Sequence, residues 1–160
     1  MVISPCATRK TKMLLVQQYN YLLKSLLDKL DQKYFLILTG TNNDSNFITN
    51  ITAGIKSERL KSLVGKVSLK ELAYLLSISN LVITPDSGPA YISEAVGAKT
   101  VVFFTSTTPD KYGPFSDNVR LFYNPVFCSP CYKDKCKNYT CLKNFEIDEL
   151  IKISLNFLKE

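Results

Sequence analysis

Residues 80–91 carry the residue types of an anion-binding turn between a strand and a helix. A β-branched apolar run is followed by Asp86 and Ser87, whose side-chain oxygens can cap a helix N-terminus. Gly88 allows a ligand to approach the backbone closely, and Pro89 is favoured in a first helical turn. Unpaired N–H groups at a helix N-terminus attract negative charge. The stretch therefore predicts a phosphate or diphosphate site, with an ordinary strand-to-helix turn as the alternative.

Four cysteines form a second chemical signal. Their spacing, C-x2-C-x4-C-x4-C, is that of a zinc knuckle with cysteine at the usual histidine position, and the residues are Cys128, Cys131, Cys136 and Cys141. Four thiolates can close a tetrahedral zinc site, and zinc knuckles bind single-stranded nucleic acid. Lysines and tyrosines interleaved with the cysteines suit such binding. The spacing leaves three contents open: structural zinc, disulfides in an oxidising compartment, or reduced thiols that pack a loop.

Composition limits the class of protein. The 160 residues are 46% hydrophobic and 21% charged, and we expect residues 1–160 to form one globular domain. A net charge of +6 favours an anionic partner such as nucleic acid, anionic lipid or a nucleotide phosphate. Histidine is absent, which excludes imidazole bases and histidine-ligated metals within this chain. The sequence contains no leader pattern and no run near the ~18 apolar residues of a membrane span, so we expect a cytoplasmic protein.

Strands and helices are predicted to alternate along the chain. Apolar runs predict strands over residues 2–5, 34–40, 60–66, 80–85, 100–104 and 119–123. Helical periodicity predicts helices over residues 15–30, 47–55, 68–76, 88–97 and about 146–159, with a cysteine-rich loop at 128–141. This alternation favours a doubly wound parallel α/β sheet, which is Rossmann-like.

The third predicted helix has a clear start signal. Ser68 and Glu71 match a capping box, in which each side chain satisfies the other's backbone N–H group. The buried face of this helix is expected to consist of Leu69, Leu72, Ala73 and Leu76.

Four loops should share one rim of the sheet, because ligands of such folds bind outside the carboxyl ends of the strands. Thr8 and Lys12, in the loop after the first strand, can contact phosphate or form a solvated basic loop. Asp44 can accept hydrogen bonds from a ribose or cap a helix, and the residues alone favour the cap. Four hydroxyl side chains at residues 105–108 are expected to form a lip for a polar ligand.

Five motifs in this order resemble glycosyltransferase family 9, the ADP-heptose lipopolysaccharide heptosyltransferases and their relatives. They are residues 37–40 with Asp44, 65–72, 86–89, 104–109 and 128–131, and together they cover nearly the whole chain. The resemblance is to the C-terminal, nucleotide-sugar-binding half of a GT-B glycosyltransferase. It implies an N-terminal acceptor domain, in cis or in trans, that holds the catalytic aspartate base. It also implies metal-independent, inverting transfer with no required cofactor.

The resemblance also implies roles for individual residues. Thr8 and Lys12 would contact the diphosphate of the donor, with Lys12 stabilising the leaving group, while Asp44 would bind the ribose and the backbone near Val67 the adenine. The residues around the phosphates and sugar would be Asp86, Ser87, Gly88 and Pro89. Tyr91 is the ninth residue expected to bind the substrate. It stands where the family usually has histidine, and a phenol donates a hydrogen bond but rarely carries charge near neutral pH.

The function expected from the resemblance is transfer of a heptose-like sugar from a nucleotide diphosphate sugar, with an ADP-sugar favoured. The acceptor would be lipopolysaccharide or another glycan, which adds the periphery of the inner membrane to the expected cytoplasmic location. Nucleic acid is not favoured as a partner. Two alternatives stay open: a nucleic-acid-binding protein with a zinc knuckle, and a non-catalytic remnant of the transferase, which Tyr91 and the unmatched N-terminal half suggest.

Overall fold

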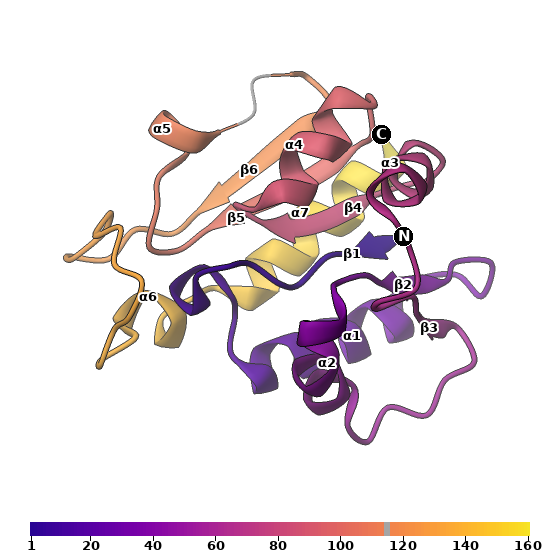
Figure 1. Ribbon diagram of the computed structural model, residues 1–160, viewed down its shortest axis with the longest axis horizontal. Coiled ribbons are helices and arrows are strands. Elements are labelled where there is room, and N and C mark those ends of the chain that lie inside the picture. Colours follow the sequence, from indigo (N-terminus) through magenta and orange to yellow (C-terminus); the bar gives the residue numbers. More distant parts are fainter. Residues whose placement is uncertain (114–115) are drawn as a thin grey trace.

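A computed structural model describes residues 1–113 and 116–160. Within these ranges, parallel strands form one sheet in the order β3-β2-β1-β4-β5-β6 (Figure 1). The strands are β1 (Val2–Ile3), β2 (Leu36–Leu38), β3 (Leu60–Ser62), β4 (Val82–Pro85), β5 (Thr100–Phe104) and β6 (Val119–Tyr123). This is the strand order of doubly wound dinucleotide-binding folds, so the predicted fold class is confirmed.

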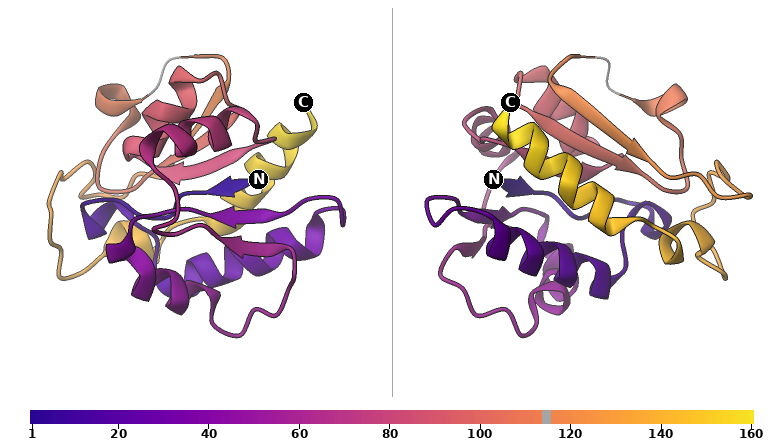
Figure 2. Two further views of the ribbon diagram at one scale, coloured as in Figure 1. Left: turned by 45° about the vertical axis from the view of Figure 1, so that its right-hand side comes forward. Right: turned by 180° about the vertical axis from the view of Figure 1, so that it is seen from behind.

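Helices cover both faces of the sheet (Figure 2). The α-helices are α1 (Val16–Lys29), α2 (Ser45–Thr52), α3 (Leu69–Ser77), α4 (Gly88–Ala95), α5 (Pro109–Tyr112), α6 (Thr140–Lys143) and α7 (Ile147–Lys159), and η1 (Lys10–Lys12) and η2 (Asn42–Asp44) are 3₁₀ turns. The helices α1, α2 and α7 pack on one face, and α3 and α4 pack on the other. In the described part of the chain, no helix has the length and apolar character needed to cross a membrane.

The strands are short, and each face of the sheet receives alternate residues. Ile3 and Ile83 join the core beneath α1, α2 and α7, whereas their neighbours Val2 and Val82 join the core beneath α3 and α4. Because both faces are covered, β1 and β2 are entirely apolar and β4 and β5 nearly so, which is the pattern that predicts a parallel sheet. The edge strands β3 and β6 include the exposed residues Lys61 and Arg120.

Several predicted boundaries need correction. The first strand ends at Ile3 and not at residue 5, the second spans Leu36–Leu38 and not 34–40, and α2 and α4 end at Thr52 and Ala95, before residues 55 and 97. The third strand was expected to reach Lys66 but ends at Ser62. The chain turns at Gly65, whose φ is +69°, and a Cβ there would lie 1.7 Å from the Asn42 side-chain oxygen. Only glycine fits this crowded, left-handed position. The second helix begins at Ser45, directly after η2, and not at Phe47.

The predicted capping box of α3 is confirmed, but its predicted buried face is wrong in part. The Ser68 N–H donates to Glu71 Oε2 at 2.7 Å. Hydrogen bonds from the backbone and the side chain of Ser68 lower the pKa of Glu71. Leu76 is buried, but Leu69 is 70% exposed. Leu69 is the first residue of the helix and lies at the rim of a cavity beyond the end of the sheet. Leu72 and Ala73 are half-buried.

The cysteine-rich segment lies beyond the carboxyl ends of β5 and β6, at one end of the molecule (Figure 1). It is attached through its backbone, because the N–H groups of Cys131 and Tyr132 both donate to the carbonyl of Ser106, at 3.1 and 2.9 Å. The predicted terminal helix follows as α7, and its bounds agree with the expected range of about 146–159.

Tyr19 anchors the start of the loop that follows β1. Its ring is fully buried and its hydroxyl donates to the Pro5 carbonyl at 2.7 Å. Tyr21, on the same helix, is 46% exposed and donates to Asp148. We expect Tyr19→Phe to lower the free energy of unfolding by about 1–3 kcal/mol, because a buried carbonyl loses its partner. Tyr21→Phe should change it by less than about 0.5 kcal/mol. Urea unfolding measures both, and equal losses would contradict the assignment.

Candidate functional site

The order in which strands are added to the sheet reverses at its centre, between β1 and β4. β1 and β4 are neighbours, and the helices that follow them, α1 and α4, pack on opposite faces. The loops that leave these two strands therefore diverge, and a crevice forms between them. Two adjoining cavities occupy this crevice, and together they are lined by all nine predicted binding residues.

The first, which we call the wide cavity, has a volume of about 770 Å³. This volume lies in the range of sites that enclose small organic ligands. Leu69, Leu72 and Ile92 form an apolar side, and Ser4 and Thr39 supply hydroxyl groups. The predicted binding residues that line it are Thr8, Asp44, Val67, Ser87, Gly88 and Pro89.

Asp44 has a capping role, but not at the helix expected. Its Oδ2 accepts hydrogen bonds from the N–H and hydroxyl of Thr41, at 2.7 and 2.8 Å, and so closes η2. Its side chain makes no cap hydrogen bond to α2, although Asp44 occupies the N-cap position of that helix. Cys6 lines the same cavity, and burial, followed by the nearby Asp44 carboxylate, raises the pKa of Cys6 to about 12. The Cys6 thiol is therefore neutral at physiological pH.

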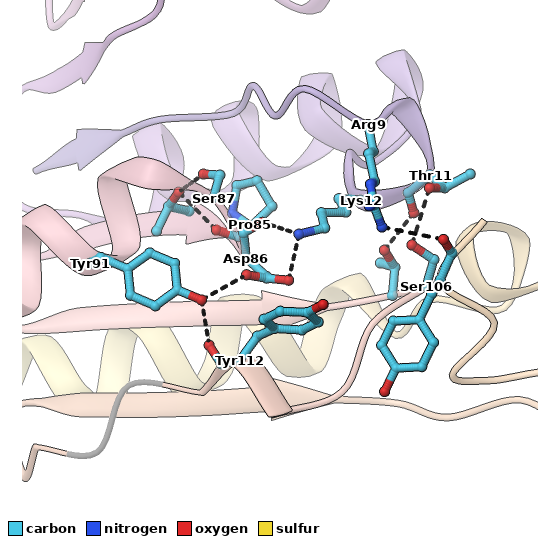
Figure 3. Close-up of polar contacts among 12 residues, drawn as sticks. Arg9, Thr11, Lys12, Pro85, Asp86, Ser87, Tyr91, Ser106 and Tyr112 are labelled. Atoms are coloured by element: carbon cyan, nitrogen blue, oxygen red, sulfur yellow. Dashed lines mark hydrogen bonds and ion pairs between the residues drawn. The ribbon is translucent and has the colours of Figure 1, made fainter. Parts of the chain in front are cut away.

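The second, which we call the narrow cavity, has a volume of about 380 Å³ and contains a buried ion pair. The Lys12 ammonium lies 2.7 Å from Asp86 Oδ2 and also donates to the Asp86 carbonyl at 3.1 Å (Figure 3). The Asp86 side chain is 3% exposed and the Lys12 side chain 17%. The pair ties the loop after β1 to the end of β4.

The first turn of α4 has no side-chain cap, which corrects the predicted capping by Asp86 and Ser87. Ser87 occupies the N-cap position, but its hydroxyl pairs with the Thr84 hydroxyl at 3.1 Å, and the Asp86 carboxylate binds Lys12. A Cβ at Gly88 would meet nothing within 4 Å. The missing side chain therefore leaves open space beside the helix N-terminus, in the wall shared by both cavities.

Tyr91 and Tyr112 line the narrow cavity. The Tyr91 hydroxyl donates to the Tyr112 carbonyl at 2.9 Å and lies 3.4 Å from Asp86 Oδ1. Burial, followed by the Asp86 carboxylate, raises the pKa of Tyr91, so its hydroxyl stays protonated. The sequence reasoning missed Tyr112 and Arg9 as lining residues. Arg9 lies between Thr8 and Lys12, and the only sequence signal for Tyr112 is its place after β5.

The four hydroxyl residues after β5 do not form the predicted lip. They are buried and line neither cavity. Thr105 donates to the Thr11 carbonyl at 2.7 Å, and Ser106 donates to the Thr11 hydroxyl at 3.1 Å. Thr11 in turn donates to the Lys133 carbonyl at 2.6 Å. The hydroxyls of Thr105 and Ser106 therefore hold η1 in place through Thr11, and they do not face a ligand cavity.

The cysteine-rich segment also supports η1. Arg9 donates to the Tyr132 carbonyl at 3.2 Å and forms an ion pair with Asp134 at 2.7 Å. All five cysteines are free thiols. Across residues 1–113 and 116–160, no three cysteine, histidine, aspartate or glutamate side chains lie together so that they could hold a metal ion. Cys128 is exposed and Cys141 is buried. Structural zinc stays a prediction, which metal analysis of the reduced protein tests.

Comparison with known sequences gives the family. Residues 1–141 match the family described as glycosyltransferase family 9 (heptosyltransferase). The chain is 28% identical over 134 residues to the lipooligosaccharide heptosyltransferase 2 of Campylobacter jejuni subsp. jejuni serotype O:2, covering 80% of this chain and 42% of that protein. The chain spans less than half the length of the curated relatives it matches.

Solved structures show the same fold. The structure of E. coli ADP-heptose lipopolysaccharide heptosyltransferase II superimposes with a TM-score of 0.79 at 20% identity, covering 99% of this chain and 46% of that chain. E. coli heptosyltransferase WaaC with ADP gives a TM-score of 0.77 at 16% identity, covering 98% and 43%. The family match covers most of the sequence, and the fold agrees with it. This chain belongs to glycosyltransferase family 9.

Proposed function

We propose that this chain is the donor-binding domain of a glycosyltransferase that transfers a heptose-like sugar from a nucleotide diphosphate sugar to lipopolysaccharide or another glycan. One observation carries the proposal: two adjoining cavities meet at the uncapped N-terminus of α4, with the Lys12 ammonium beside it. The family match and the ADP named with the WaaC structure support an ADP-sugar as the donor.

In this proposal the wide cavity takes the nucleoside. The apolar surface of Leu69, Leu72 and Ile92 suits a planar base, and the Asp44 carboxylate suits ribose hydroxyls. Thr8, Ser87 and Gly88 line both cavities. The diphosphate would lie across these shared residues, and the sugar would enter the narrow cavity.

The proposed chemistry follows from where charge develops. Transfer breaks the bond between the anomeric carbon of the sugar and the diphosphate oxygen, so negative charge grows on the departing nucleoside diphosphate. Lys12 and the N–H groups of α4 lie where they would stabilise that charge, and the proposal requires no cofactor. The acceptor and the general base would come from an N-terminal domain, in cis or in trans.

The first test compares two lysines of η1. Lys12 lines the narrow cavity, whereas Lys10 is exposed and lines neither cavity. We expect Lys12→Ala to weaken ADP binding by about 1.5–3 kcal/mol, or roughly 10- to 150-fold, because a charge-assisted contact is lost. Lys10→Ala should change the affinity by less than about 0.5 kcal/mol. Titration calorimetry measures both.

Lys12→Ala also leaves the Asp86 carboxylate buried without a partner, which can cost stability. The double variant Lys12→Met with Asp86→Asn removes both charges and serves as the folded reference, with thermal melting as the check. It should still bind ADP at least about tenfold more weakly than the wild type, because the ammonium is absent. Wild-type protein that binds no ADP at millimolar concentration would contradict the proposal and favour the non-catalytic alternative.

The second test asks which cavity holds the nucleoside. Cys6 lines the wide cavity, and its pKa of about 12 predicts slow alkylation whose rate rises about tenfold per pH unit. Cys136 lies outside both cavities, and hydrogen bonds from the backbone of Tyr139 and Asn138 lower its pKa, so its alkylation should be faster. We expect ADP to slow iodoacetamide labelling of Cys6 several-fold and to leave Cys136 unchanged, as measured by peptide mass spectrometry. Unprotected Cys6 would place the nucleoside elsewhere.

A further inference from the structure

Two tyrosines of the narrow cavity have no role in the transfer proposed above. Tyr91 comes from α4 and Tyr112 from α5, and Figure 3 shows both beside the Lys12–Asp86 ion pair. We propose that these tyrosines are positioning residues: Tyr91 fixes Tyr112 through its hydroxyl, and the ring of Tyr112 then orients the Lys12 ammonium toward the site of the diphosphate. The role of Lys12 in this inference rests on the proposed function.

The Tyr91 hydroxyl is placed to tie two elements together. It has one proton and two nearby acceptors, the Tyr112 carbonyl at 2.9 Å and Asp86 Oδ1 at 3.4 Å. The shorter distance identifies the carbonyl as the acceptor. The helix α5 has only four residues, and the tie joins its last residue to the middle of α4. It therefore fixes one wall of the narrow cavity.

The ring of Tyr112 contacts the cation directly. Lys12 Nζ lies 5.3 Å from the ring centroid, within the range of a cation–π contact. Two donors of the ammonium go to the carbonyl and carboxylate of Asp86, so the ring restricts the remaining side of a long, flexible side chain. Tyr132 meets the Tyr112 ring edge-on, with centroids 6.1 Å apart, and Lys111 Nζ lies 5.2 Å from the same ring. The ring is thus held from several sides.

The two tyrosines act through different atoms. Tyr91 uses its hydroxyl, whereas Tyr112 uses its ring and its backbone carbonyl, and within the described ranges no hydrogen bond is formed by the Tyr112 hydroxyl. Phenylalanine should therefore be harmful at position 91 and harmless at position 112. A site that needed only bulk at both positions would not separate the two substitutions.

The first experiment measures ADP affinity of the full chain by calorimetry. We expect Tyr91→Phe and Tyr112→Leu to weaken binding about 3- to 10-fold and Tyr112→Phe to change it less than twofold. In a Lys12→Ala background, Tyr112→Leu should have no further effect, because the ring acts through Lys12. Tyr74→Phe, on the exposed face of α3, is the matched control. Equal losses from Tyr112→Phe and Tyr112→Leu would overturn the inference.

The second experiment needs no nucleotide. A proton above an aromatic ring is shifted upfield, so the ε-methylene NMR signals of Lys12 report its contact with Tyr112. The shift should be kept in Tyr112→Phe, lost in Tyr112→Leu and reduced in Tyr91→Phe. An unchanged shift in Tyr91→Phe would overturn the positioning role of the two tyrosines even if ADP binds as proposed. A shift with the expected pattern in protein that binds no ADP would overturn the proposed function and leave this positioning role intact.

Discussion

The ion pair between Lys12 and Asp86 is the contact on which the site depends. Doubly wound sheets open a crevice where helices leave neighbouring strands on opposite faces, and here the pair spans that crevice between β1 and β4. Both charges are largely withdrawn from water, so each requires the other, and the geometry of the pair sets the separation of the two loops. The residues next to the pair, Ser87 and Gly88, line both cavities. An anion that enters must compete with Asp86 for the donors of Lys12, while the N–H groups of α4 have no side-chain competitor.

The rigidity behind this pair comes from segments that are distant in sequence. Thr11 is 1% exposed, accepts hydrogen bonds from Thr105 and Ser106, and donates one to the Lys133 carbonyl. Arg9 donates to the Tyr132 carbonyl and forms an ion pair with Asp134. The backbone of η1 is thus fixed from the side away from the cavities, and the Lys12 side chain extends from this fixed backbone to Asp86. The cysteine-rich segment contributes to the site in this way through backbone carbonyls and an aspartate, independently of what its thiols hold.

The sequence predicts the fold and the general place of the site well, because both depend on local patterns. Largely apolar runs that begin at Leu36 and Thr100 indicate buried parallel strands. Because ligands of such sheets bind outside the carboxyl ends of the strands, residues as far apart as Thr8 and Tyr91 are expected at one rim. The predictions that fail depend on tertiary contacts. The Asn42 side chain occupies the space that a Cβ at Gly65 would need. The buried residues 105–108 include Ser106, which donates to Thr11 from 95 positions away in the sequence. Tyr112 enters the site through a hydrogen bond from another helix, which no spacing rule encodes.

Tyr91 changes how the positive charge of the site is distributed. Members of family 9 usually have a histidine at the position of Tyr91, and a histidine could carry a positive charge there. In this chain the pKa of Tyr91 is raised, and its hydroxyl donates its proton to the Tyr112 carbonyl. Arg9 is paired with Asp134, and Lys111 lies over the rings of Tyr112 and Tyr132 and does not line the narrow cavity. Lys12 is the cationic side chain that contacts both the carbonyl and the carboxylate of Asp86, two residues before α4 begins. Under the proposed function, such a site would concentrate the stabilisation of a departing diphosphate on one ammonium group and one helix N-terminus, so the orientation of that ammonium would set how well the charge is stabilised.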